Sequence, residues 1–239
     1  LRSFNDGATW SILSNGLSNA RIAELAVHPT QAETLYVATS DAGAFRSTNG
    51  GDSWDASNNG LTDQALVSLR ISPSAPNVIY VGSTTGKVFK STDNAGIWSD
   101  ITRNLTFGVP ISALSVAPDS SNVVYVGTGP LSNLGVQRLK QTGLGTITSF
   151  ATGIAPEAIV AGDFNGDAVT DLVVANGGEN DLSVFLTSSF GSVLTRNDFR
   201  VGSGPVMVRA GDLDGDGDLD LVAANHIKRT LSVLFNDST

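Results

Sequence analysis

The chain has 239 residues, no cysteine, 26 glycines and a formal net charge of −9. The lack of cysteine excludes thiol catalysis, cysteine-ligated zinc and iron–sulfur clusters. The acidic balance argues against nucleic acid as a partner, because phosphate binding needs clustered lysine and arginine. No apolar run approaches the roughly 20 residues of a membrane-spanning helix, so we expect no membrane insertion.

A repeat of 44 residues organises the N-terminal part of the chain. The segment Ser-Phe-Asn-Asp-Gly-Ala-Thr-Trp at residues 3–10 recurs in related form at 47–54 and 91–98. Between the copies, Leu25-x-Val27-x-Pro29 returns as Leu69-x-Ile71-x-Pro73. Alternating apolar residues, β-branched runs and Gly/Asn/Ser/Pro punctuation predict short strands throughout, and no stretch shows a sustained helical period.

Each copy places an asparagine or aspartate early in a turn and a tryptophan at its end. Such a side chain accepts backbone N–H groups, glycine supplies the positive φ, and the tryptophan packs against the sheet. The expected capping residues are Asn5, Asn49 and Asp93, and the expected structural tryptophans are Trp10, Trp54 and Trp98. In the third copy Ala95 and Ile97 replace the usual glycine and threonine, so we expect a distorted turn there.

The motif resembles the Asp-box, or bacterial neuraminidase repeat (BNR), which sialidases, sortilin-type receptors and xyloglucanases carry. The resemblance covers residues 1–150 and implies propeller blades.

A second repeat, with a period of 49 residues, follows in the C-terminal part. Pro156–Asn176 aligns with Pro205–Asn225, and each copy holds a loop with oxygen-bearing side chains at positions 1, 3, 5 and 9. Calcium prefers six to eight oxygen ligands, and position 7 adds a backbone carbonyl. The predicted metal ligands are Asp163, Asn165, Asp167, the Val169 carbonyl and Asp171, then Asp212, Asp214, Asp216, the Asp218 carbonyl and Asp220.

The charge distribution agrees with two such sites. Residues 1–150 carry 10 acidic and 9 basic side chains, whereas residues 151–239 carry 13 and 5. Close carboxylates repel one another unless a cation neutralises them. The second loop has more carboxylates, so we expect it to bind calcium more tightly. An EF-hand is excluded because position 12 is Val174 or Ala223 instead of glutamate, and a strand follows.

These loops resemble FG-GAP/VCBS repeats, familiar from integrin α-chain propellers and some lectins. The resemblance covers residues 153–239 and implies two structural Ca²⁺ ions as the cofactors.

Repeats of 40 to 50 residues with about four strands each predict a single all-β propeller over residues 1–239. We expect five blades of four antiparallel strands: three Asp-box-type blades in 1–152 and two FG-GAP-type blades in 153–239. The ring would close by pairing of the N- and C-terminal strands, with residues 1–12 completing the last blade. The alternative is a window cut from a larger ring.

No catalytic residues are predicted. The sialidase arginine triad and Arg-Ile-Pro signature are absent, and Glu24 and Asp63, outside the loops, come with no supporting motif. We expect His28 and His226 to be exposed loop residues. The loop between Gly127 and Ser149 joins the two repeat types and could carry ligand contacts.

The sequence therefore favours a non-catalytic, calcium-stabilised binding or adhesion module that contacts glycans or proteins, as a monomer. Low charge and abundant Ser, Thr, Asn and Gly are typical of secreted or cell-surface β proteins. The chain begins at Leu1 without a leader, which suggests a processed product or a fragment. The alternatives are the propeller portion of a glycoside hydrolase or an inert scaffold.

Overall fold

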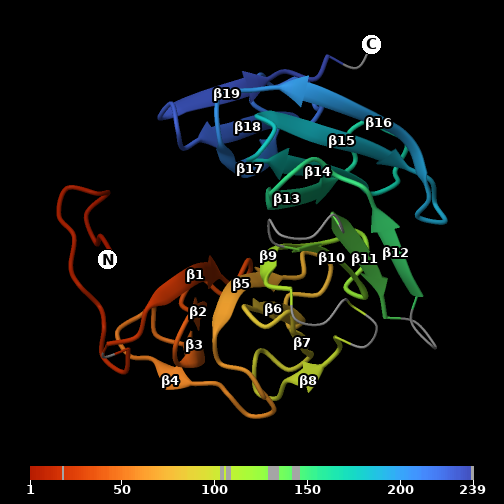
Figure 1. Ribbon diagram of the computed structural model, residues 1–239. Helices are drawn as coiled ribbons and strands as arrows, with labels where there is room; N and C mark the ends of the chain where they lie inside the picture. The colour runs from red at the N-terminus through yellow and green to blue at the C-terminus, as the bar shows by residue number, and fades with distance from the viewer. Residues whose placement is uncertain (18, 103–104, 106–108, 129–134, 142–145, 238–239) are drawn as a thin grey trace. The chain divides into compact units, whose positions relative to one another are not determined.

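The computed structural model describes residues 1–17, 19–102, 105, 109–128, 135–141 and 146–237, which form five antiparallel β-sheets (Figure 1). In each sheet, neighbouring strands are consecutive in the chain, so every sheet is a meander. The described residues contain no helix, and hence none that could cross a membrane. The fold is a five-bladed, all-β propeller, as predicted.

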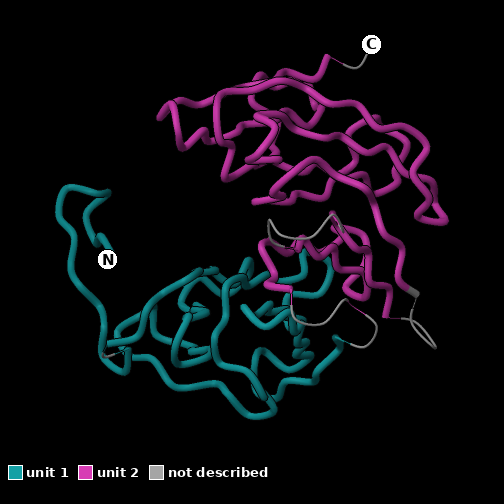
Figure 2. Tube along the Cα trace, in the orientation of Figure 1, with its two compact units in different colours: residues 1–103 teal, residues 104–239 magenta. Residues whose placement is uncertain are grey.

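The chain divides into two compact units, Leu1–Arg103 and Asn104–Thr239 (Figure 2). The first unit holds two four-stranded sheets. The strands of its first sheet are β1 Ile22–Val27, β2 Leu35–Thr39, β3 Gly43–Ser47 and β4 Asp55–Ala56. The strands of its second sheet are β5 Leu66–Ile71, β6 Ile79–Ser83, β7 Val88–Ser91 and β8 Ser99–Asp100.

The second unit holds three sheets. The third sheet consists of β9 Ile111–Val116, β10 Val123–Thr128, β11 Val136–Lys140 and β12 Thr146–Phe150. The fourth sheet consists of β13 Pro156–Gly162, β14 Asp171–Asn176, β15 Asp181–Thr187 and β16 Val193–Arg200. The fifth sheet consists of β17 Pro205–Gly211, β18 Asp220–Asn225 and β19 Thr230–Leu234.

The fifth sheet has three strands in the described part of the chain, instead of the four that were predicted. The segment expected to complete it makes other contacts. Arg2 and Ser11 form an antiparallel bridge with each other, and the Arg2 guanidinium pairs with Glu33 and donates to the Gly50 carbonyl. Pairing of residues 1–12 with the last sheet therefore stays a prediction.

Within each unit, neighbouring sheets pack through their apolar faces. The apolar residues of these faces come from equivalent positions of the repeat. In the first unit, Leu66 and Leu69 of β5 are 0% and 1% exposed and pack in one cluster with Tyr36 and Ala38 of β2. In the second unit, the ring centroid of Phe150 lies 6.4 Å from that of Tyr125 and 6.0 Å from that of Phe185. Burial of these faces, at about 25 cal/mol per Å² of apolar surface, is the main stabilisation of each unit.

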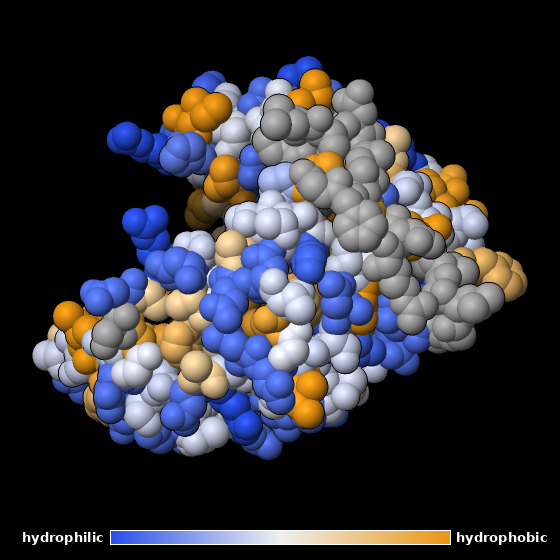
Figure 3. Space-filling model, turned by 60° about the horizontal axis from the view of Figure 1, so that its bottom comes forward, coloured by the Kyte–Doolittle hydropathy of each residue, from blue (hydrophilic) through white to orange (hydrophobic). Residues whose placement is uncertain are grey.

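Some apolar positions are not covered in this way. Ile22 and Leu25 of β1 occupy the repeat positions of the buried Leu66 and Leu69 of β5, yet each is more than half exposed. The face drawn in Figure 3 likewise shows apolar residues scattered among polar ones. The repeat thus fixes which residues are apolar, while the neighbouring sheet decides whether they are buried.

The three copies of the turn motif, at residues 3–10, 47–54 and 91–98, share one hydrogen-bond pattern. In the second copy the Ser47 hydroxyl accepts the Gly51 N–H at 2.9 Å, and Asn49 Oδ1 accepts the Ser53 N–H at 3.0 Å. The first copy repeats both bonds at 2.7 and 2.8 Å. The last two copies connect the third and fourth strands of their sheets. The prediction of a capping Asn or Asp in each turn is confirmed.

The prediction of a distorted third turn is wrong. Ser91 Oγ accepts the Ala95 N–H at 3.0 Å, and Asp93 Oδ1 accepts the Ile97 N–H at 2.9 Å. Ala95 takes the place of the glycine with a φ of 67°. The bonds from Ile97 and Ser91 hold the pKa of Asp93 below its usual range, although slight desolvation acts in the opposite direction. The side-chain cap therefore enforces the turn even without glycine.

The tryptophans differ in burial. Trp54 and Trp98 are 7% and 3% exposed, and the Trp98 indole N–H donates to the Ser57 carbonyl at 2.7 Å. Trp10 is 60% exposed and donates only to Gly7 of its own turn, at 3.1 Å. The structural role is confirmed for Trp54 and Trp98 and does not hold for Trp10, whose ring is mostly exposed among the described residues.

Candidate functional site

The first aspartate-rich loop, residues 163–171, connects β13 to β14 and folds around its first carboxylate. Asp163 Oδ1 accepts the Gly166 N–H at 2.8 Å, and Oδ2 accepts the Ala168 N–H, also at 2.8 Å. Asp167 Oδ1 accepts the Val169 N–H at 2.8 Å. Each bond closes a short turn of the kind that Asx residues favour. The loop therefore curls around the Asp163 carboxylate, which accepts two of its N–H groups.

The second loop, residues 212–220, connects β17 to β18 with the same geometry. Asp212 accepts the Gly215 and Gly217 N–H groups at 2.6 and 3.2 Å. Carboxylate oxygens of Asp212, Asp214 and Asp216 lie within 4.8 Å of one another, and all three residues are exposed. Three anionic oxygens at such separations form a cradle for a hard cation, whose oxygen ligands lie at 2.3–2.6 Å.

The last aspartate of each loop also accepts hydrogen bonds from backbone N–H groups of residues outside the predicted ligand set, which the sequence pattern did not predict. Asp171 is fully buried, and its two oxygens accept the Phe164 and Thr187 N–H groups at 3.1 and 2.8 Å. Asp220 is also fully buried and accepts the Leu213 and Asn236 N–H groups at 2.8 and 2.9 Å. Each carboxylate ties the start of its loop to a residue at or just past the end of a later strand, Thr187 at the end of β15 and Asn236 after β19. Lone pairs remain on both oxygens for a cation.

The electrostatics of the loops favour a bound cation. Burial raises the pKa of Asp171, and the charges of Asp167 and Asp163 raise it further. Desolvation and the charges of Asp216, Asp220 and Asp212 raise the pKa of Asp214. A raised carboxyl pKa means that ionisation is unfavourable at these positions. The donor set, all hard oxygen, fits Ca²⁺, which would supply the missing positive charge.

The structure brings three predicted ligands of the second loop together, Asp212, Asp214 and Asp216, and the first loop shares the hydrogen-bonded turns but shows no such group among the described residues. Asn165 stands in the first loop where Asp214 stands in the second, so the first loop has three carboxylates and the second has four, apart from Asp218. Position 7, Val169 or Asp218, offers a backbone carbonyl. The order of calcium affinities remains a prediction.

Backbone strain distinguishes the two loops. Ala168 and Gly217 occupy equivalent positions with φ of 62° and 97°. Ala168 is exposed, and a Cβ at Gly217 would meet nothing within 4 Å. We expect Ala168→Gly to raise the free energy of unfolding by about 0.5–1 kcal/mol, because alanine is disfavoured in the left-handed region. The matched Gly217→Ala should lower it by about 1 kcal/mol. Urea unfolding in excess chelator measures both, and equal signs would contradict the assignment to φ.

The acidic candidates outside the loops act as structural acceptors. Glu24 on β1 accepts the Ser68 hydroxyl at 3.1 Å and the Leu69 N–H at 2.7 Å, and it pairs with Arg70. These bonds join β1 to β5 across the two sheets of the first unit. Both carboxylate oxygens are therefore occupied, which leaves the side chain poorly suited to proton transfer.

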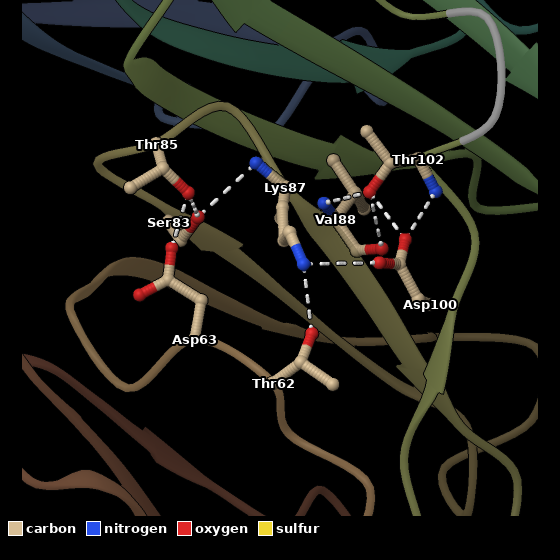
Figure 4. A network of polar contacts seen from close by, with 8 residues as sticks. All are labelled: Thr62, Asp63, Ser83, Thr85, Lys87, Val88, Asp100 and Thr102. Carbon is tan, nitrogen blue, oxygen red and sulfur yellow. Dashed lines mark hydrogen bonds and ion pairs between the residues drawn. The ribbon is translucent and has the colours of Figure 1, made fainter. Parts of the chain in front are cut away.

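Asp63 belongs to a polar network at one end of the second sheet (Figure 4). It accepts the Ala65 N–H at 3.0 Å and the Thr85 hydroxyl. Burial alone would raise the pKa of Asp63, but these bonds and the Lys87 charge together lower it. Lys87 also donates to Thr62 at 2.8 Å and lies 3.6 Å from an Asp100 oxygen. The network caps the turn between β6 and β7.

The two histidines differ in burial. His226 is exposed, as predicted. His28 is only 4% exposed, so the prediction for it is wrong. The chain from Pro29 to Thr34 folds back over it: the His28 N–H donates to the Thr34 carbonyl at 2.9 Å, and its Nδ1 accepts the Thr30 N–H at 3.3 Å. Part of the predicted junction loop, 129–134 and 142–145, lies outside the described residues.

The sheets and loops together define a β-propeller, and residues 163–223 match the family model of the FG-GAP-like repeat. No curated protein matches the chain significantly. Among solved structures, an ancestral GH74 enzyme aligns with a TM-score of 0.62 at 16% identity, over 90% of this chain and 35% of that one. The GH74 xyloglucanase from Xanthomonas campestris aligns with a TM-score of 0.58 at 16% identity, over 90% and 39%.

This chain spans less than two-fifths of the length of either GH74 structure. At 16% identity the likeness shows the fold alone.

Proposed function

We propose that this chain is a calcium-stabilised, non-catalytic binding or adhesion module, secreted or at the cell surface, that contacts glycans or proteins through its loops. The observation that carries the proposal is the convergence of Asp212, Asp214 and Asp216 within a loop that lies in the matched FG-GAP-like segment. Calcium at both loops would fix the β13–β14 and β17–β18 connections and thereby the surface around them.

A second candidate is the propeller portion of a glycoside hydrolase, which the likeness to GH74 structures favours. Hydrolysis of a glycosidic bond needs two carboxyl groups facing a cleft at a set separation. Glu24 and Asp63 instead accept backbone and hydroxyl donors at sheet connections. This arrangement supports the binding module over the enzyme.

Thermal unfolding in calcium and in chelator tests the calcium part. Ligand at 100 times its dissociation constant adds about 2.7 kcal/mol, so we expect a clear upward shift of the midpoint in calcium. Asp216→Ala should reduce that shift, whereas Asp181→Ala, outside both loops, should not. An unchanged midpoint in wild type would refute structural calcium.

A glycan array and a fluorogenic glycoside assay, both with calcium, separate the two functions, since array hits without turnover support binding.

A further inference from the structure

Residues 1–12 contain a strand pair that follows the register of the 44-residue repeat. Arg2 and Ser11 exchange both backbone hydrogen bonds, at 3.0 and 2.9 Å. The equivalent pairs, one and two periods later, join the third and fourth strands of the first and second sheets: Arg46–Asp55 and Lys90–Ser99. The Arg2–Ser11 bridge therefore has the place of a third–fourth strand pair, and the described residues hold no first and second strand for it.

The neighbouring apolar face of the first sheet is open. A cavity of about 340 Å³ lies on this face, and its apolar lining includes Leu17, Ile22, Leu25, Leu35 and Trp54. The equivalent residues of the second sheet are all buried: Leu61, Leu66, Leu69, Ile79 and Trp98. The two faces have the same apolar pattern, so the difference comes from the sheet that covers the second one.

A buried donor on the open face lacks its acceptor. The Trp98 indole N–H donates to the carbonyl of Ser57, which follows β4 and is held by a bond from its N–H to the Ala44 carbonyl of β3. Trp54 is the equivalent of Trp98 and is 7% exposed, yet its Nε1 has no hydrogen-bond partner among the described residues. The equivalent of Ser57 is Leu13, for which the chain has no counterpart of Ala44. A buried N–H group without an acceptor is unfavourable, so a sheet that fixed the Leu13 carbonyl would stabilise this unit.

The existing interface between the first two sheets defines what fits the open face. There, Ala26 of β1 and Tyr36 and Ala38 of β2 pack on the second sheet, so small residues and one aromatic ring fill the space. Every strand of the described residues already belongs to one of the five sheets. The fifth sheet has three strands, one more than this place lacks.

We propose that residues 1–17 and the open face of the first sheet bind two antiparallel strands of the β1–β2 pattern, from a segment outside residues 1–239. The two strands would pair with residues 1–3 and complete a four-stranded sheet, in the way that an extended segment adds to an exposed sheet edge. Their apolar side chains would fill the cavity beside Trp54. This inference does not depend on the proposed binding function.

A chain that carries the two strands tests the proposal. A copy of residues 14–44 fused before Leu1 keeps the repeat register, and the same 31 residues in shuffled order are the matched control. All three tryptophans lie in the N-terminal unit, so their fluorescence reports its unfolding. We expect the fusion to raise the thermal midpoint of this unit by about 5 °C or more over the control, because apolar surface is covered.

Trp10 gives a second signal. Leu17 and Val37 pack on Trp54, and their copies in the fusion would cover Trp10 in the same way. The emission of Trp10, taken as the difference between each chain and its Trp10→Phe variant, should therefore move to shorter wavelength in the fusion and stay unchanged in the shuffled control.

Leu25→Ala distinguishes covering of the face from a general effect of added chain. Leu25 is 52% exposed, so in the unmodified chain the substitution should lower the midpoint by less than about 4 °C. In the fusion Leu25 should be covered like its equivalent Leu69, which is 1% exposed, and the loss should be at least twice as large.

Several results would overturn the proposal. Equal midpoints of the fusion and the shuffled control, or equal losses from Leu25→Ala in both backgrounds, would show that the face does not bind the added strands. Emission of a buried indole from Trp10 in the unmodified chain would show that its own strands already fill the surface. A concentration-dependent dimer in sedimentation, abolished by Leu25→Asp, would show that a second copy fills it.

Discussion

Trp98→Ala is expected to lower the free energy of unfolding of the N-terminal unit by about 3–5 kcal/mol. Trp98 is 3% exposed and packs with Tyr36, Leu69 and Phe89, so truncation removes apolar contacts and leaves a cavity. It also leaves the Ser57 carbonyl without the indole donor, which lies at 2.7 Å. Both effects act on the packing between the two sheets of this unit.

Denaturant unfolding followed by far-UV circular dichroism measures this loss, because the signal does not depend on the deleted fluorophore. Trp10→Ala is the matched control at the same position of the first turn-motif copy. Trp10 is 60% exposed, so its truncation should change the free energy of unfolding by less than about 0.5 kcal/mol. Similar losses in the two variants would show that the turn itself, and not burial of the ring, is what the tryptophan stabilises.

Asp171→Ala is expected to destabilise the C-terminal unit by roughly 2–6 kcal/mol even in chelator, because two buried N–H groups lose their acceptor at about 1–3 kcal/mol each. Those groups are the amides of Phe164 and Thr187, at 3.1 and 2.8 Å. The raised pKa of Asp171 reflects unfavourable burial of its charge, so its removal offsets part of this loss. The same variant should also lose calcium stabilisation at the first loop.

Asp167→Ala separates the two roles of the loop carboxylates. Asp167 is exposed, and its carboxylate accepts N–H groups only within the loop. We expect this variant to keep nearly the wild-type stability in chelator and to lose the calcium-dependent gain of the first loop. Urea unfolding of Asp167→Ala and Asp171→Ala, each with calcium and with chelator, gives the four free energies of unfolding to compare with wild type. If Asp171→Ala were as stable as wild type in chelator, its bonds to Phe164 and Thr187 would carry no net stabilisation.

Local patterns in the chain predicted the parts of the structure that depend on near neighbours. Alternating apolar residues predict strands, and Asn, Asp and Gly predict turns, because both depend on a few neighbouring residues. The repeat periods then predict how these strands and turns group into blades. Even the third turn formed without its glycine, because Ser91 and Asp93 supply its bonds within six residues. The two aspartate-rich loops were recognised for the same reason, and their role as calcium ligands stays a prediction.

The sequence by itself determined the all-β propeller, its repeats and the grouping of carboxylates into two short loops. Only the tertiary structure decided that Trp98 is buried and Trp10 exposed, that His28 is covered by the chain after it, and that Asp171 binds a strand 16 residues away. The physical reason is that burial and long-range hydrogen bonds depend on which sheet packs beside a residue, and repeats of one sequence pattern do not encode that difference.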